Sequence, residues 1–155
     1  MTSREFARFF RPFVRVLLDW EAVEEADWPV DVDAVDTVAG LADWYFPWHV
    51  GPDGDEARFD DPGARPLRVL DWAPASFSAH RDAVDAAAAV LRDLPLPTQL
   101  VIGAYALPNG GRLVLDGNHR LAAIVQEGMA FRGLVVTLNG PLDERILPDL
   151  RHWIV

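Results

Sequence analysis

The order of apolar segments between residues 66 and 140 restricts the fold more than any other feature of the chain. Pro95 and Pro97 end a helical pattern, Asn109-Gly110 predicts a tight hairpin, and Gly128 predicts the end of a second helix. The predicted elements are a strand at 67–72, a helix from Ser76 or Ser78 to Leu94, strands at 99–107 and 112–115, a helix at 118–127, a strand at 133–139 and a short helix at 142–151. This β-α-β-β-α-β order predicts an α+β fold, in which helices pack against a small mixed sheet.

Residues 1–62 are predicted to form an α-helical extension of this core. Residues 4–20 place arginines on one stripe and large apolar side chains on the opposite face, although Pro12 should kink this helix or divide it in two. Asp31 or Asp33 can cap a second helix near 34–45. The Gly-, Pro- and Asp-rich residues 51–66 predict a loop between the extension and a core at 63–155. The 155 residues fit one domain.

The formal net charge of −10 is carried by the extension. Residues 1–62 hold five basic and fifteen acidic side chains, whereas residues 63–155 hold nine of each. A net-negative chain repels nucleic acid at long range, which argues against a DNA-binding role. The acidic extension is instead a candidate surface for a protein partner.

Several classes of protein are disfavoured by composition. The absence of cysteine excludes disulfides, thiolate catalysis and cysteine-zinc sites. The sequence has no apolar run of about 18 residues, so no membrane span is expected. The first twenty residues lack the continuous apolar stretch of a signal peptide, and a cytoplasmic location is therefore expected.

Residues 116–120 (DGNHR) lie where a predicted strand ends and a predicted helix begins. Gly117 can turn the chain sharply, and the amides that open the helix would point outward with the positive end of the helix dipole behind them. Arg120 can clamp phosphate oxygens, and His119 can donate a further hydrogen bond. Asp116 is placed to hold Mg²⁺ or to orient Arg120. The turn predicts an anion site, although Asp116 and Asn118 also fit a simple turn and cap, with Arg120 paired to a surface carboxylate.

The aromatic segment 44–49 (WYFPWH) is the second candidate contributor to a site. Trp and Tyr offer apolar walls with polar tips, so this segment could cover the turn and form a substrate pocket. Trp48 and His49 are its candidate pocket residues, and His49 is also a candidate acid or base near pH 7. The alternative is that these aromatic side chains belong to the core.

Residues 113–123 (LVLDGNHRLAA) resemble the phosphate-binding motif of the ParB/sulfiredoxin superfamily in its Asp-Gly-x-His-Arg form. The predicted order of elements over residues 66–140 also follows that fold, whereas the first 60 residues do not match it. The resemblance implies a nucleotide-binding fold in which this turn holds the phosphates of ATP or CTP, usually with Mg²⁺. Gly117, Asn118, His119 and Arg120 would then be phosphate ligands, and His80 would face the nucleotide.

Members of this superfamily include sulfinic-acid reductases, chromosome-partition proteins, small-metabolite kinases and nuclease-like proteins. Asn118 stands where the sulfiredoxins have a reactive cysteine, so sulfinic-acid reduction by that mechanism is excluded. Partition proteins usually add a helix-turn-helix region, for which the sequence after the last predicted strand offers little room.

These observations predict a small-molecule enzyme that transfers a phosphoryl group from a Mg²⁺-nucleotide, chemistry that depends on positioning and charge neutralisation. His119 and Arg120 would bind phosphate, with Asp116 as the first choice for metal ligand or base and Asp71 as the second. One alternative is a non-catalytic module that binds a nucleotide, another ligand or a protein. A second alternative is a metabolic enzyme that uses the turn for the anionic group of its substrate and binds no nucleotide.

Overall fold

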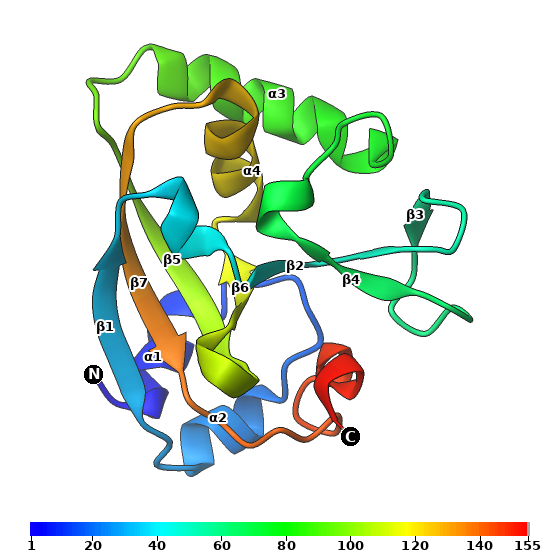
Figure 1. Ribbon diagram of the computed structural model, residues 1–155. Coiled ribbons are helices and arrows are strands. Elements are labelled where there is room, and N and C mark those ends of the chain that lie inside the picture. Colours follow the sequence, from blue (N-terminus) through cyan, green and yellow to red (C-terminus); the bar gives the residue numbers. More distant parts are fainter. Residues whose placement is uncertain (155) are drawn as a thin grey trace.

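The computed structural model describes residues 1–154 as a mixed α+β fold with one mixed sheet of seven strands (Figure 1). The strands are β1 (Val30–Val35), β2 (Trp44–Val50), β3 (Glu56–Ala57), β4 (Arg65–Arg68), β5 (Thr98–Ala106), β6 (Arg112–Asp116) and β7 (Phe131–Leu138). The helices are α1 (Ser3–Phe10), α2 (Trp20–Glu25), α3 (Ser78–Arg92) and α4 (Asn118–Glu127). Short 3₁₀ turns are η1 (Val38–Leu41), η2 (Val69–Asp71), η3 (Pro108–Gly110) and η4 (Pro148–Trp153).

The strand order β1-β7-β5-β6-β2-β3, with β4 also paired to β2, places β6 inside the sheet. β5 and β6 form an antiparallel hairpin, and α4 carries the chain from β6 to β7, which pairs with β5 in parallel. On its other side, β6 pairs in parallel with the start of β2, where Trp44 lies opposite Arg112. The turn that follows Asp116 therefore opens at the end of an interior strand.

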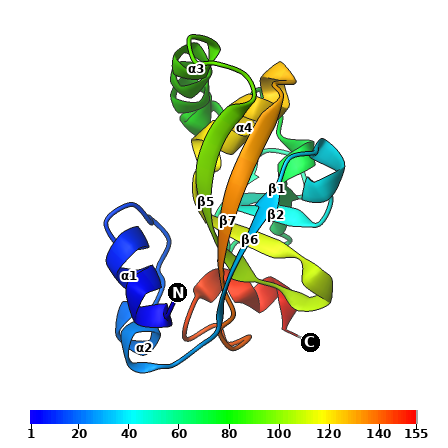
Figure 2. The same cartoon turned by 90° about the vertical axis from the view of Figure 1, so that its left-hand side faces the viewer.

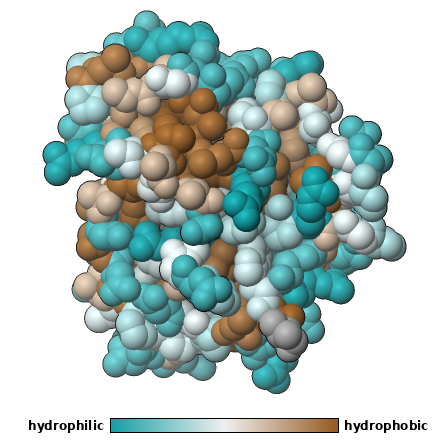
Figure 3. All heavy atoms as spheres, in the orientation of Figure 1, coloured by the Kyte–Doolittle hydropathy of each residue, from teal (hydrophilic) through white to brown (hydrophobic). Residues whose placement is uncertain are grey.

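Alternate side chains of the central strands enter two separate cores. Leu100, Ile102 and Ala104 of β5 pack with α3, α4 and the aromatic residues of β2. Tyr105, on the other face, packs with the phenylalanines of α1 and with the C-terminal segment. In Figure 2, α1 and α2 lie beside the strands and α3 and α4 lie above them. On the face seen in Figure 3, hydrophobic side chains gather over α4.

From α3 to β7, the elements begin and end within two residues of the predicted positions. The hairpin uses positive φ at both Asn109 (62°) and Gly110 (78°), the conformation that favours this pair in tight turns. Gly128 ends α4 in the left-handed conformation, with its N–H bonded to the Ile124 carbonyl. One detail differs: α3 begins after Phe77 without a side-chain cap, so neither Ser76 nor Ser78 has the predicted capping role.

The first half contains strands where a helix is predicted. Residues 30–35 pair with β7 over six positions, and the predicted helix near 34–45 is replaced by the end of β1, η1 and the start of β2. Asp31 and Asp33 lie within β1 and cap no helix. The alternation Val-Asp-Val-Asp has the period of a strand, and pairing with β7 decides between the two patterns. The extension is therefore not an all-helical unit, because β1 and β2 belong to the same sheet as β5, β6 and β7.

Three further predicted elements have different bounds. α1 ends at Phe10, before Pro12, so residues 11–19 leave the predicted helix of 4–20. The predicted strand at 67–72 is β4, which ends at Arg68, followed by η2. The predicted helix at 142–151 is instead the 3₁₀ turn η4. Among residues 1–154, none of the helices has the length and apolar character that a membrane crossing needs.

Candidate functional site

The turn between β6 and α4 presents unpaired backbone N–H groups. Gly117 has φ +94° and ψ 12°, a left-handed conformation that turns the chain from strand to helix within one residue. No side chain caps α4, and its first hydrogen bond is donated by the N–H of Leu121 to the Gly117 carbonyl, 2.9 Å away. Within residues 1–154, the N–H groups of Asn118, His119 and Arg120 have no partner, so this end of α4 is suited to an anion.

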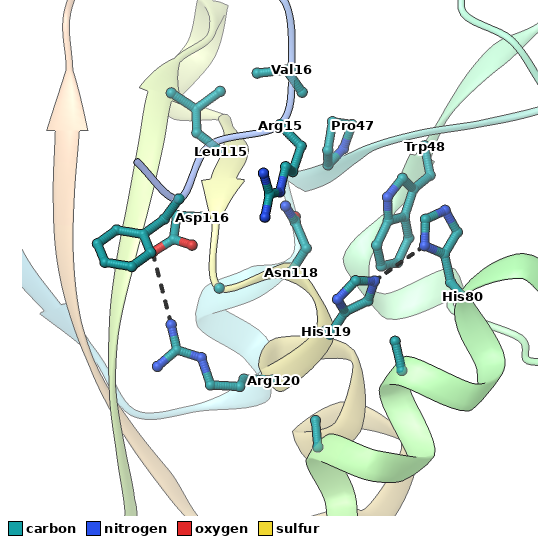
Figure 4. A pocket seen from close by; sticks show the side chains of 14 residues that line it. Arg15, Val16, Pro47, Trp48, His80, Leu115, Asp116, Asn118, His119 and Arg120 are labelled. Carbon is teal, nitrogen blue, oxygen red and sulfur yellow. Dashed lines mark hydrogen bonds and ion pairs between the residues drawn. The ribbon is translucent and has the colours of Figure 1, made fainter. Parts of the chain in front are cut away.

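A cavity of about 660 Å³ opens at this turn. Its volume lies in the range of small-molecule sites. The lining residues come from the segment after α1, from β2, from α3 and from the turn itself; they are Phe13, Arg15, Val16, Pro47, Trp48, His80, Ala83, Ala87 and residues 115–120. Figure 4 shows Arg15, Asn118, His119 and Arg120 around the same space. The cavity therefore joins both halves of the chain.

Two arginines give the cavity positive charge. Arg120 Nη2 lies 3.8 Å from Asp116 Oδ2, so the predicted partner of Arg120 is the carboxylate at the start of the same turn. Arg120 Nη2 also lies 3.5 Å from the Val101 carbonyl oxygen. Arg15 is exposed and forms no ion pair or hydrogen bond with another residue of 1–154. An anion in the cavity could therefore bind the free guanidinium of Arg15 and the guanidinium of Arg120, which lies near the start of α4.

His119 and His80 bring the first turns of α4 and α3 into contact. His119 Nε2 lies 3.1 Å from His80 Nδ1, and His80 Nε2 lies 3.2 Å from Glu56 Oε1. The Trp48 ring stacks on both imidazoles, with centroid distances of 4.1 Å to His80 and 5.4 Å to His119. Burial lowers the pKa of His119, and the neighbouring His80 lowers it further. His119 is therefore neutral near pH 7 and able to accept a proton.

Asp116 is the one acidic side chain that lines the cavity within the described residues. No group of three or more His, Asp or Glu side chains within residues 1–154 could enclose a metal ion. Mg²⁺ commonly binds one or two carboxylates and completes its shell with substrate phosphates and water. Among residues 1–154, Asp116 is the one residue of this cavity that could serve as a protein ligand in that mode.

The structure brings most of the predicted site residues together, with two exceptions. Trp48 and His80 lie in the same cavity as residues 116–120. His49 points to the other face of β2, where it is 3% exposed and lies beside Asp149. Asp71 lies in η2, because β4 ends three residues before it, and it lines a separate cavity with Arg68 and Ser76. The predicted roles of His49 and Asp71 in this pocket are therefore not supported by their positions.

The sequence prediction omits several residues of the site, among them Arg15, Phe13 and Glu56. The sequence predicts Arg15 on the solvated stripe of a helix, yet the helix ends at Phe10 and Arg15 reaches the cavity. Pro12 is the sequence signal that the helix ends before Arg15. Phe13 also lines the cavity while its side chain is largely exposed. Glu56 lies in a loop-like acidic segment that gives no signal for its contact with His80.

His49 and Asp149 form a second buried titratable pair, with Nε2 and Oδ2 3.9 Å apart. Burial, and to a smaller extent the nearby His152, lowers the pKa of His49 to about 4. Burial raises the pKa of Asp149 to about 6. Between pH 6 and pH 4 the folded state holds a proton on Asp149, whereas the unfolded state holds one on His49, whose ordinary pKa is 6.5. The two contributions to the pH dependence of stability therefore offset each other in this range.

Asp149→Asn should expose the contribution of His49 alone. A histidine with a lowered folded-state pKa stabilises the fold above pH 6.5, and this stability is lost as the pH falls towards 4. The variant should therefore lose up to about 3 kcal/mol more than the parent between pH 6.5 and 4. His49→Gln should show the opposite trend, gaining stability as the pH falls through 6. Urea unfolding at several pH values measures both, with Asp82→Asn, an exposed site, as the control. Parallel profiles for all four proteins would contradict the assignment.

No family model, no curated protein and no solved structure matches this chain.

Proposed function

We propose that this chain is an enzyme that transfers a phosphoryl group from a nucleotide to a hydroxyl group of a small molecule. The observation that carries the proposal is the uncapped start of α4, where three unpaired N–H groups open into a cavity that also holds Arg15 and Arg120. Backbone N–H groups and guanidinium groups together are the donors that phosphates select. The resemblance of residues 113–123 to a phosphate-binding motif supports the same ligand class.

In this mechanism the turn binds and orients the phosphates. The N–H groups of residues 118–120 donate hydrogen bonds to one phosphate, and Arg15 and Arg120 stabilise the charge that spreads over the transferred group. Asp116 stands beside these donors and would repel an unaccompanied anion. Mg²⁺, held by Asp116 and the phosphates, would neutralise that charge. Nucleotide binding is therefore expected to depend on Mg²⁺.

One unoccupied acceptor in the cavity favours a hydroxyl as the second substrate group. His119 is neutral at pH 7 and retains one ring nitrogen beyond its contact with His80. A hydroxyl could donate to that nitrogen. The side chain of His119 is thus better placed to take a proton than to bind phosphate.

Thermal melts test the proposal with ATP, ADP, CTP and pyrophosphate, each with and without Mg²⁺. A ligand at 100 times its Kd adds about 2.7 kcal/mol to stability, which for this size of domain raises the Tm by roughly 5–10 °C. Gly117→Ala should lose most of this shift, because a Cβ there would strain the left-handed backbone and lie 3.3 Å from the Val101 carbonyl oxygen. The N–H groups would then move off the ligand.

Gly128→Ala is the matched control. Gly128 is also left-handed (φ +64°), but it lies at the far end of α4 with open space around it. Both variants should lower the Tm of the free protein, Gly117→Ala more than Gly128→Ala, and only Gly117→Ala should weaken the ligand shift. A wild-type protein whose Tm rises with none of the four ligands would contradict the proposal. A shift with ATP but no consumption of ATP, with or without hydroxyl compounds, would favour a binding module.

A further inference from the structure

Three side chains connect the cavity to the edge strand β3 through short contacts. His119 and His80 both line the cavity, and Glu56 of β3 lies beyond His80. Glu56 also lines a second cavity, together with Arg58 and Phe59. The three groups thus form a continuous path from the ligand-binding space to the outer surface.

The ends of this path fix the direction of its hydrogen bonds. A carboxylate only accepts, so His80 Nε2, 3.2 Å from Glu56 Oε1, carries a proton. In the neutral ring, His80 Nδ1 is then an acceptor, and the proton of the 3.1 Å contact belongs to His119 Nε2. His119 Nδ1 is left with a free lone pair. In Figure 4 this second ring nitrogen is on the side of Asn118.

The surroundings hold all three groups in place. Trp48 is 9% exposed and stacks on His80 with an interplanar angle of 22° and on His119 with an angle of 28°. The backbone N–H of Glu56 donates to the Ser76 carbonyl, 3.2 Å away, which ties β3 to the turn before α3. The aromatic face of Trp48 also favours positive charge on the imidazole above it. The path is therefore built into the packing of β2, β3 and α3.

We propose that Glu56 and His80 form a proton relay that makes His119 the general base for the acceptor hydroxyl. This inference rests on the proposed phosphoryl transfer and adds a positioning residue, Glu56, to it. The substrate class is accordingly an alcohol, whose proton must leave as its oxygen attacks phosphorus. Glu56 itself touches no substrate and acts through His80.

The step balances as follows. The alcohol oxygen attacks the terminal phosphorus of a nucleoside triphosphate, the bond from that phosphorus to the bridging oxygen breaks, and the diphosphate leaves with the bond electrons. The alcohol proton passes to His119 Nδ1, while the proton on His119 Nε2 passes to His80 Nδ1. His80 then holds protons on both nitrogens and is paired with the Glu56 carboxylate. The positive charge ends next to Glu56, and His119 remains neutral.

Glu56→Gln tests the relay, with Glu144→Gln as the control for an exposed glutamate. Nitrogen NMR of the wild-type imidazoles should show both rings protonated at Nε2 and His119 Nδ1 bare. A glutamine amide can either accept from His80 or donate to it, so in Glu56→Gln both rings should become mixtures of tautomers. ATP hydrolysis, in which water takes the place of the alcohol that His119 deprotonates, should slow at least tenfold in kcat with an unchanged KM, because general base catalysis commonly contributes about 10²–10⁴-fold. Glu144→Gln should match the wild type in both measurements.

The outcomes separate the relay from the phosphate site. A wild-type His119 protonated at Nδ1, or a single unchanged tautomer in Glu56→Gln, would overturn the relay even if ATP stabilises the protein. An unchanged kcat in Glu56→Gln would also overturn it. If the wild-type tautomers are as expected but the Tm does not respond to ATP, the phosphoryl-transfer function is contradicted. The direction of the hydrogen bonds between Glu56, His80 and His119 is supported in that case.

Discussion

Replacing Arg15 and Arg120 together by alanine should weaken the binding of ATP or pyrophosphate by about 10²–10⁴-fold. A hydrogen bond to a charged group contributes about 1.5–3 kcal/mol, and each guanidinium can supply at least one such bond to a phosphate. The two side chains reach the cavity from different elements, Arg15 from the segment after α1 and Arg120 from α4. Because both groups would contact the same ligand, a coupling energy between the two single substitutions is expected. Titration calorimetry of the two single variants and the double variant measures this directly.

The matched control is the double variant Arg4→Ala with Arg81→Ala. It removes the same total charge from two exposed arginines that do not line the cavity. Its binding should fall only slightly, because charges far from the ligand are screened within about 10 Å in ordinary salt. Equal losses in both double variants would show that net charge, and not the cavity, governs binding. An unchanged affinity for ATP in the double variant of Arg15 and Arg120 would contradict the binding of phosphate in this cavity.

The turn at residues 116–120 could be predicted from sequence because its structure is local. Gly117 must supply a left-handed residue between a strand and a helix, and neighbouring residues alone determine that requirement. The same holds for the hairpin at Asn109 and for the end of α4 at Gly128. All three depend on the conformational freedom of single residues. Such signals are independent of distant contacts.

The remaining members of the site depend on long-range pairing. His80 meets Glu56 only because the segment after β2 turns back past the start of α3, and no spacing in the sequence specifies that contact. The predicted helix at 34–45 overlaps the end of β1, whose pairing with β7 joins residues about a hundred positions apart in the chain. The apolar spacing within one segment carries no signal for so distant a partner. The sequence predicts Asp71 in a strand at 67–72, but β4 ends at Arg68 and Asp71 lies in the 3₁₀ turn η2.

Phe10→Ala should be among the most destabilising single substitutions in the first half of the chain. Phe10 is fully buried, and its ring packs against Phe6 with a centroid distance of 4.7 Å. The ring also fills the space above Gly103 of β5, where a Cβ would lie only 2.8 Å from Phe10 Cδ1. The sheet thus provides a hollow that fits this ring, and alanine would leave it empty. The expected cost is about 3–5 kcal/mol in the free energy of unfolding, measured by urea denaturation.

Phe9→Ala is the control, because Phe9 is the preceding residue of the same helix and is 53% exposed. It should cost distinctly less, about 1–2 kcal/mol, because about half of Phe9 stays in water, although its ring contacts Phe10 with a centroid distance of 4.8 Å. The comparison also bears on the site. α1 leads directly into Phe13 and Arg15, so loosening its attachment to β5 should reduce ATP affinity in the folded Phe10→Ala protein, with Phe9→Ala unaffected. Equal stability losses for the two variants would mean that Gly103 does not anchor α1. A large loss of stability with unchanged ATP affinity would mean that Arg15 is positioned by something other than α1.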